Sequence, residues 1–238
     1  MKYMGSKNRI AKYILPIILK NRKENQYYVE PFVGGANMID KVQGKRIGAD
    51  INGYLIEALI LIRDTPWLIP DVITEEEYQT YKKKMIIDGM TGFVGFAMSF
   101  GGKWFAGYRR DFAGTKGDFE NMKTQTRRAK VNAIRQSKLM GGIRFVNESY
   151  KNLIIPNNSL IYCDPPYKGV TGYKTDFNHE EFWDWCRVKS KEGHEVYVSE
   201  YDAPDDFECV WSGELSNTIS RKSSRKECER LFKLKQVG

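Results

Sequence analysis

Four consecutive residues, Asp164-Pro165-Pro166-Tyr167, combine groups suited to holding a planar ring that carries an amine. They follow the apolar run 160–163, which is typical of a buried strand, so we expect them at the carboxyl end of that strand. Prolines have a fixed φ and no N–H, which leaves their carbonyls available as acceptors. Asp164 and the Pro165 carbonyl are therefore expected to accept hydrogens from one amino group, while Tyr167 stacks on the ring. The alternative is a strand followed by a Pro-Pro turn, with Tyr167 as a packing residue.

A second set of candidate residues lies near the N-terminus. Residues 27–29 are predicted to form a strand that leads into a glycine turn, Glu30-Pro-Phe-Val-Gly-Gly-Ala-Asn37, and then into helical residues 38–42. Residues 45–50 are predicted to form a second strand, which ends in Asp50, 20 residues after Glu30. This pattern is typical of the first unit of a doubly wound nucleotide-binding sheet, where the acid accepts both ribose hydroxyls. Alternatively, Asp50 only caps the end of its strand.

The composition limits the class of protein. The 238 residues are 41% hydrophobic and 13% aromatic, enough for one large domain or a core with a smaller insert. No segment approaches the roughly 20 apolar residues of a membrane span, and the N-terminus lacks signal-peptide features, so we expect a cytoplasmic protein with no membrane partner. Four dispersed cysteines and two histidines predict neither a metal site nor a disulfide framework.

The net charge of +8 is unevenly distributed. Residues 101–150 contain 11 Lys/Arg and 4 Asp/Glu, and residues 219–235 contain 7 and 2. Two basic zones on an otherwise slightly acidic chain are typical of a protein that binds a polyanion. Solvated surface faces are the alternative explanation.

The remaining pattern predicts an α/β sheet with an insertion. A polar helix is expected over residues 75–84, with a capping box that begins at Thr74, and a longer helix over 119–139. Further strands are expected over 143–146, 160–163 and 196–199, and a helix over 179–189. The simplest organisation is a sheet domain formed by residues 1–53 and 140–238, interrupted by an insert over 54–139.

With these motifs in order, the chain resembles a known group, the Dam-type (D12, or α, class) DNA adenine-N6 methyltransferases. The resemblance covers nearly the whole length. It implies a Rossmann-like methyltransferase sheet that binds S-adenosylmethionine (SAM), with a mostly helical target-recognition insert. It also implies a bacterial or bacteriophage setting, as an orphan modifier or as the methylase of a restriction-modification pair. The matching segments are 2–7 (KYMGSK), 30–36 (EPFVGGA), 164–167 (DPPY) and the basic segment 221–232 (RKSSRKECERLF) before a final strand.

The resemblance also implies a reaction. The adenine N6 would attack the methyl group of SAM in line, while Asp164 and the Pro165 carbonyl favour its pyramidal form. The base must flip out of the duplex to be reached, with Tyr167 as its stacking platform. Residues 148–150 stand where the third family motif falls, near the cofactor's adenine. The implied cofactor-binding residues are Tyr3, Lys7, Glu30, Phe32, Gly34, Gly35, Asp50 and Asp164, and the implied catalytic residues are Asp164, Pro165, Pro166 and Tyr167.

The sequence leaves open the role of Lys7 and the backbone conformation at Ala36. Lys7 is either a functional residue or a surface lysine at the start of the segment 3–20. Ala36 stands where the family's loop often has a second glycine, and a positive φ there would cost roughly 1 kcal/mol. We expect Gly35 to take over that turn.

The insert contains the residues expected to contact double-stranded DNA. Arginine can read guanine in the major groove or contact phosphate, and both roles stay open for Arg109 and Arg110. Trp104 and Phe105 are expected in the core of the insert. We expect a monomer or a weak dimer. The candidate DNA-binding residues are Lys103, Tyr108, Arg109, Arg110, Arg127, Arg128 and Lys130.

Three other functions share part of this pattern. An NAD-dependent oxidoreductase would explain the glycine turn and Asp50 but not residues 164–167. A methyltransferase acting on RNA or protein is a second alternative, although the basic insert favours duplex DNA. A DNA-binding protein that kept the fold and lost turnover is the third.

Overall fold

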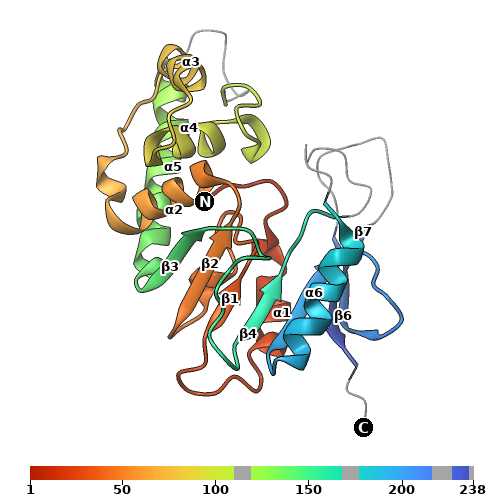
Figure 1. Cartoon of the computed structure of the whole chain (residues 1–238). Helices are drawn as coiled ribbons and strands as arrows, with labels where there is room; N and C mark the ends of the chain where they lie inside the picture. The colour runs from red at the N-terminus through yellow and green to blue at the C-terminus, as the bar shows by residue number, and fades with distance from the viewer. Residues whose placement is uncertain (110–118, 168–176, 216–226, 236–238) are drawn as a thin grey trace.

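The centre of the molecule is a seven-stranded sheet with the order β3-β2-β1-β4-β5-β7-β6 (Figure 1). The structure is a computed structural model that describes residues 1–109, 119–167, 177–215 and 227–235. Strands β1 to β5 are parallel, and β7 is antiparallel to both of its neighbours. This sheet confirms the predicted α/β class. The strands are β1 (Tyr28–Glu30), β2 (Arg46–Asp50), β3 (Ile143–Asn147), β4 (Leu160–Cys163), β5 (Glu195–Glu200), β6 (Phe207–Leu215) and β7 (Glu227–Leu234).

Helices cover both faces of the sheet, so the central strands are apolar on both sides. In β4, Leu160 and Tyr162 pack in the core that contains α1, whereas Ile161 and Cys163 pack in the core that contains α6. Such double burial explains why β4 is a continuous apolar run rather than an alternating one. The helices are α1 (Ala11–Ile18), α2 (Gly53–Asp64), α3 (Glu75–Lys84), α4 (Gly89–Ala97), α5 (Phe119–Met140) and α6 (His179–Lys191).

The regular elements described between residues 54 and 139 are helical. Figure 1 shows α3 and α4 at one end of the molecule, with α5 leading back to β3. Helix α3 begins where expected, because the Thr74 hydroxyl accepts from the Glu77 N–H while the Glu77 carboxylate accepts from the Thr74 N–H. Trp104 and Phe105 pack in the insert core, as expected. Helix α2 contacts β3 as well as α4 and α5, and the domain boundaries at 53/54 and 139/140 stay a prediction.

Two local expectations differ from the structure. The helical residues expected after the glycine turn form only a single 3-10 turn, Ile39–Lys41. Strand β6 has no counterpart among the expected strands. It is one of the two edge strands, and a bulge between Cys209 and Trp211 shifts its register and breaks the alternation by which strands are recognised.

The described residues contain neither a membrane-spanning helix nor a disulfide bond. None of the helices there is long and apolar enough to cross a membrane. All four cysteines are free thiols, and Cys163 and Cys186 are buried.

Candidate active site and cofactor pocket

Three acidic residues stand at the carboxyl ends of three adjacent parallel strands. Glu30 ends β1, Asp50 ends β2, and Asp164 immediately follows β4. The strand order places β1 between β2 and β4, so the three acids lie along the same carboxyl edge of the sheet. The carboxyl edge of an open parallel sheet is where ligands bind in such folds. The two sequence motifs therefore lie at the same edge of the sheet.

Lys7 lies buried within that site rather than on the surface. Its side chain is 7% exposed, and its ammonium lies 3.4 Å from Asp164 Oδ1 and 3.1 Å from Glu229 Oε2. Tyr167 donates its hydroxyl to the same Glu229 oxygen at 2.7 Å. The four side chains form one connected cluster, which we call the lysine cluster: Lys7, Asp164, Tyr167 and Glu229.

The electrostatics of the lysine cluster balance burial against charge pairing. Burial raises the pKa of Asp164 to about 6; the Lys7 ammonium opposes this shift and the Glu229 carboxylate adds to it. Burial by itself would lower the pKa of Lys7, but the two carboxylates raise it above its usual value. Lys7 therefore stays positively charged, and the Asp164 carboxyl has a pKa of about 6.

The ring of Tyr167 is held on two sides. The Lys7 ammonium lies 4.2 Å from the ring centroid, a cation–π distance, and the Tyr201 ring meets it edge-on at 4.6 Å. A base that stacks on the face held by Lys7 must displace that ammonium. Lys7 thus covers one face of the Tyr167 ring.

Asp50 is tied directly to the glycine turn. One of its oxygens accepts from the Asn52 N–H at 3.0 Å, and the other accepts from the Gly34 N–H at 3.4 Å. Burial raises the pKa of Asp50 to about 6, against the opposing effect of these two N–H groups. The Asp50 carboxylate is thus positioned by the backbone on either side of it.

The glycine turn is packed too tightly for a side chain at position 35. A Cβ there would lie 2.6 Å from Asn37 Nδ2 and 2.8 Å from the Met1 carbonyl oxygen. Tyr3 lies over the same turn, within 3.2 Å of where a Cβ on Gly34 would stand. Glycine is therefore required by close backbone approach at position 35.

The expectation that Gly35 would take over the left-handed turn is wrong. Ala36 itself has φ +56°, and Gly34 has φ +49°, whereas Gly35 does not have a positive φ. An alanine in the left-handed region costs roughly 1 kcal/mol relative to glycine. Ala36 is fully buried, so the surrounding contacts must hold it in this conformation.

The other predicted pocket residues lie beneath or beside this edge. Glu30 is 2% exposed and accepts a hydrogen bond from the Tyr28 hydroxyl at 2.9 Å, and burial raises its pKa well above the usual value. Phe32 packs against the rings of Tyr150 and Phe182. Tyr150, from the segment 148–150 of the third family motif, is thus an aromatic neighbour of the glycine turn.

The candidate DNA-binding residues differ in how far their side chains are exposed. Tyr108 is 8% exposed and its hydroxyl donates to the Ile73 carbonyl, so it is a core residue of the insert rather than a surface contact. Arg109 is half-buried, and Arg110 lies outside the described residues. The exposed candidates are Lys103, Arg127 and Arg128.

Lys130 is half-buried on α5, and its ammonium lies 2.8 Å from Asp71. Asp71 is exposed, and ion pairs at the surface are weak, so a phosphate can compete for the lysine.

Sequence reasoning missed Glu229. Its carboxylate belongs to β7, yet it lies 222 residues from its partner Lys7 along the chain. An acid within a mixed strand such as Glu227–Leu234 has no local signature, because basic and apolar residues alternate irregularly around it. Among the described residues, no group of acids, histidines and cysteines is arranged to hold a metal ion.

A search of known proteins found one distant relative of this chain. The type II methyltransferase M.FokI of Planomicrobium okeanokoites is 23% identical over 210 residues, which are 79% of this chain and 32% of that protein. The chain thus spans about a third of the length of this relative.

Two solved structures resemble the chain only weakly. The tRNA (m1A58) methyltransferase TrmI from Aquifex aeolicus has a TM-score of 0.41 and 11% identity, with 96% of this chain and 70% of that chain covered. SMU.472 complexed with SAH has a TM-score of 0.37 and 12% identity, with 98% and 54% covered. Neither likeness carries an argument about function.

The family comparison covers nearly the whole chain. The model of D12 class N6 adenine-specific DNA methyltransferases matches residues 3–90 and 100–231, which include the glycine turn, Asp50 and the lysine cluster. The chain therefore belongs to the D12 class of N6 adenine-specific DNA methyltransferases, whose cofactor is S-adenosylmethionine.

Proposed function

We propose that this chain transfers a methyl group from SAM to the N6 amino group of an adenine that is flipped out of duplex DNA. The observation that carries the proposal is the position of Asp164 and Asp50 along one carboxyl edge of the sheet, with Asp50 bonded to the glycine turn. One carboxylate suits the ribose of the cofactor and the other suits an amine. A methyl donor and an adenine can therefore be held side by side.

The residues at this edge fit SAM. The backbone N–H groups of Gly34 and Asn52 fix the carboxylate of Asp50, which suits the two ribose hydroxyls. Tyr3, Glu30, Phe32 and Gly34 complete the proposed pocket. When bound, SAM supplies an electrophilic methyl group on a positively charged sulfur, and the surrounding carboxylates favour that charge.

The catalytic contribution of the chain is positioning and electrostatic stabilisation. We assign Asp164 and the Pro165 carbonyl to accept hydrogens from the adenine N6, which favours the pyramidal amine as the transition state forms. Pro166 keeps the backbone of this turn rigid. Tyr167 stacks on the base after Lys7 has moved from the ring face that it covers. Such bonds matter most when they strengthen at the transition state.

The DNA surface is proposed on the insert. Lys103, Arg127 and Arg128 are exposed and suit phosphate contacts. Lys130 can contact a phosphate once the phosphate replaces Asp71 as its partner. Arg109 and Arg110 stay candidates for base readout or phosphate contact. Tyr108 is given a structural role, because its hydroxyl is used inside the insert.

The test is transfer of a labelled methyl group from SAM to mixed-sequence duplex DNA, followed by nucleoside analysis. We expect labelled N6-methyladenine, and mapping of the modified sites then gives the recognition sequence. Label in RNA or protein but not in DNA would overturn the proposed acceptor. SAM binding without transfer to any acceptor would support the alternative of a DNA-binding protein that lost turnover.

A further inference from the structure

Helix α5 has two faces with different chemistry. Arg127 and Arg128 are exposed, whereas Ala129, Ala133 and Gln136 are buried. Nine residues of helix, about 14 Å, separate Arg127 from Gln136. One rigid element thus carries proposed phosphate contacts near its middle and a buried amide near its end.

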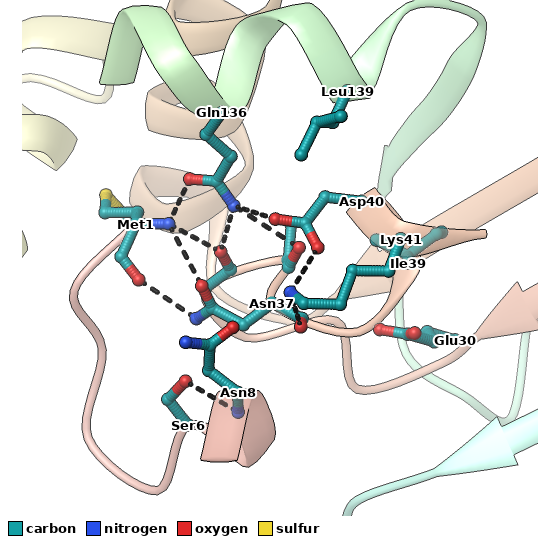
Figure 2. Close-up of polar contacts among 12 residues, drawn as sticks. Met1, Ser6, Asn8, Glu30, Asn37, Ile39, Asp40, Lys41, Gln136 and Leu139 are labelled. Carbon is teal, nitrogen blue, oxygen red and sulfur yellow. Dashed lines mark hydrogen bonds and ion pairs between the residues drawn. The ribbon is translucent and has the colours of Figure 1, made fainter. Parts of the chain in front are cut away.

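The Gln136 amide is directed into the glycine turn (Figure 2). Its Nε2 lies 3.1 Å from the Gly35 carbonyl oxygen, 3.3 Å from the Ala36 carbonyl oxygen and 3.0 Å from Asp40 Oδ2. On its other side, Oε1 accepts from the amino group of Met1. The side chain is 7% exposed, so water does not substitute for these partners.

The partners determine which way the amide must face. Two carbonyls and the Asp40 carboxylate, which also pairs with Lys41, all accept hydrogen bonds, so only the NH2 group can face them, and its two hydrogens are shared among the three acceptors. Gln136 therefore holds the two peptide groups that flank Ala36 in its left-handed conformation. Residue 136 is fastened to the same turn whose Gly34 N–H reaches Asp50.

We propose that Gln136 is a positioning residue that keeps the glycine turn ready for SAM and couples DNA contact on α5 to cofactor affinity. The part of this inference that concerns DNA rests on the proposed function and deepens it. A phosphate contact that restrains α5 restrains Gln136, and thereby the turn. Because linkage is reciprocal, SAM must tighten DNA binding by the same factor.

The experiment measures SAM affinity by calorimetry, with and without duplex DNA, in the wild-type protein and in variants at position 136. Gln136→Leu removes the donors at similar volume, and we expect about tenfold weaker SAM binding. Gln136→Glu places a carboxylate against three acceptors, so we expect it to weaken SAM binding more than Gln136→Leu does. Ser137→Ala is the matched control, because that hydroxyl bonds only to the Ile134 carbonyl within the helix, and it should bind SAM like the wild type.

A rescue variant separates positioning from general damage. Glycine adopts a positive φ without strain, so adding Ala36→Gly to Gln136→Leu should recover several-fold of the lost SAM affinity. No recovery, with thermal unfolding unchanged, would overturn the assignment of Gln136 to the turn. DNA should tighten SAM binding several-fold in the wild type and much less in Gln136→Leu.

Equal DNA enhancement in the two proteins, or none in the wild type, would overturn the coupling. Failure of the proposed function gives a different result. In that case the wild type transfers no methyl group to DNA. The SAM affinities measured without DNA still test the role of Gln136.

Discussion

At the scale of single residues, Asp164 has the most specific proposed role. Its bonds to the amine should strengthen only as the transition state forms, so its removal should affect turnover more than affinity. We expect Asp164→Ala to lower kcat by at least about a hundredfold, with the Kd for DNA changed less than about threefold. Single-turnover methyl transfer and DNA binding, measured on the same preparation, test this. Parallel losses in rate and DNA affinity would contradict the assignment.

Glu229 should act through the pKa of Asp164. Its carboxylate contributes to the raised pKa of about 6, so a neutral side chain at position 229 should lower that pKa. The ionised form of Asp164 accepts from the amine, and activity is therefore expected to rise with pH through about 6. We predict that Glu229→Gln moves this acidic limb of kcat/KM for SAM to lower pH.

A pH–rate series for the wild type and Glu229→Gln tests that prediction. Asp50→Asn is the useful comparison, because Asp50 titrates near the same pH. If both carboxylates must be ionised, the limb below pH 6 approaches a slope of two, and the lower residual activity of Asp50→Asn should show a slope of one. An unmoved limb in Glu229→Gln would argue against the pairing of Glu229 with Asp164.

At the scale of elements, the glycine turn has no room for added volume. A methyl group at position 35 would meet the Met1 carbonyl and Asn37 at distances that real Cβ atoms do not adopt, so the backbone must shift. We expect Gly35→Ala to weaken SAM binding at least tenfold. Gly141→Ala is the control, because no atom lies within 4 Å of the place where its Cβ would stand. Equal SAM affinity in the two variants would place the cofactor elsewhere.

Helix α5 should contribute to DNA binding through charge rather than sequence. Arg127 is exposed, whereas Lys130 is already paired with Asp71. We therefore expect Arg127→Ala to reduce the slope of log K against log salt by about one unit, and Lys130→Ala to reduce it less. DNA titrations at several salt concentrations measure both slopes. If Arg127→Ala keeps the wild-type slope, Arg127 is an ordinary solvated residue that does not contact phosphate.

At the scale of the whole molecule, the site joins the two ends of the chain. Lys7 and Glu229 are 222 residues apart in sequence and in direct contact in the fold. A ligand bound at this edge should therefore stabilise the entire fold. At 100 times its Kd, SAM should raise the free energy of unfolding by about 2.7 kcal/mol, and the Tm of a domain of this size by about 5–10 °C. Scanning calorimetry with increasing SAM tests this, and a constant Tm would contradict binding.

Local pattern alone determined much of this protein. The bounds of α3 and β4 match the predicted ones, because a capping box and a doubly buried apolar run are read from neighbouring residues. The ordered motifs likewise identified the family and placed Asp50 and Asp164 at strand ends. Each of these signals lies within a few residues.

Only the tertiary structure decided the contacts between distant segments. It paired Lys7 with Glu229 and buried both, whereas a lysine in a polar segment is expected at the surface. It also placed Gln136 against the turn in which Ala36, and not Gly35, adopts the left-handed conformation. The physical reason is that burial and hydrogen bonding across the sheet depend on strand order and register, which no single segment of sequence encodes.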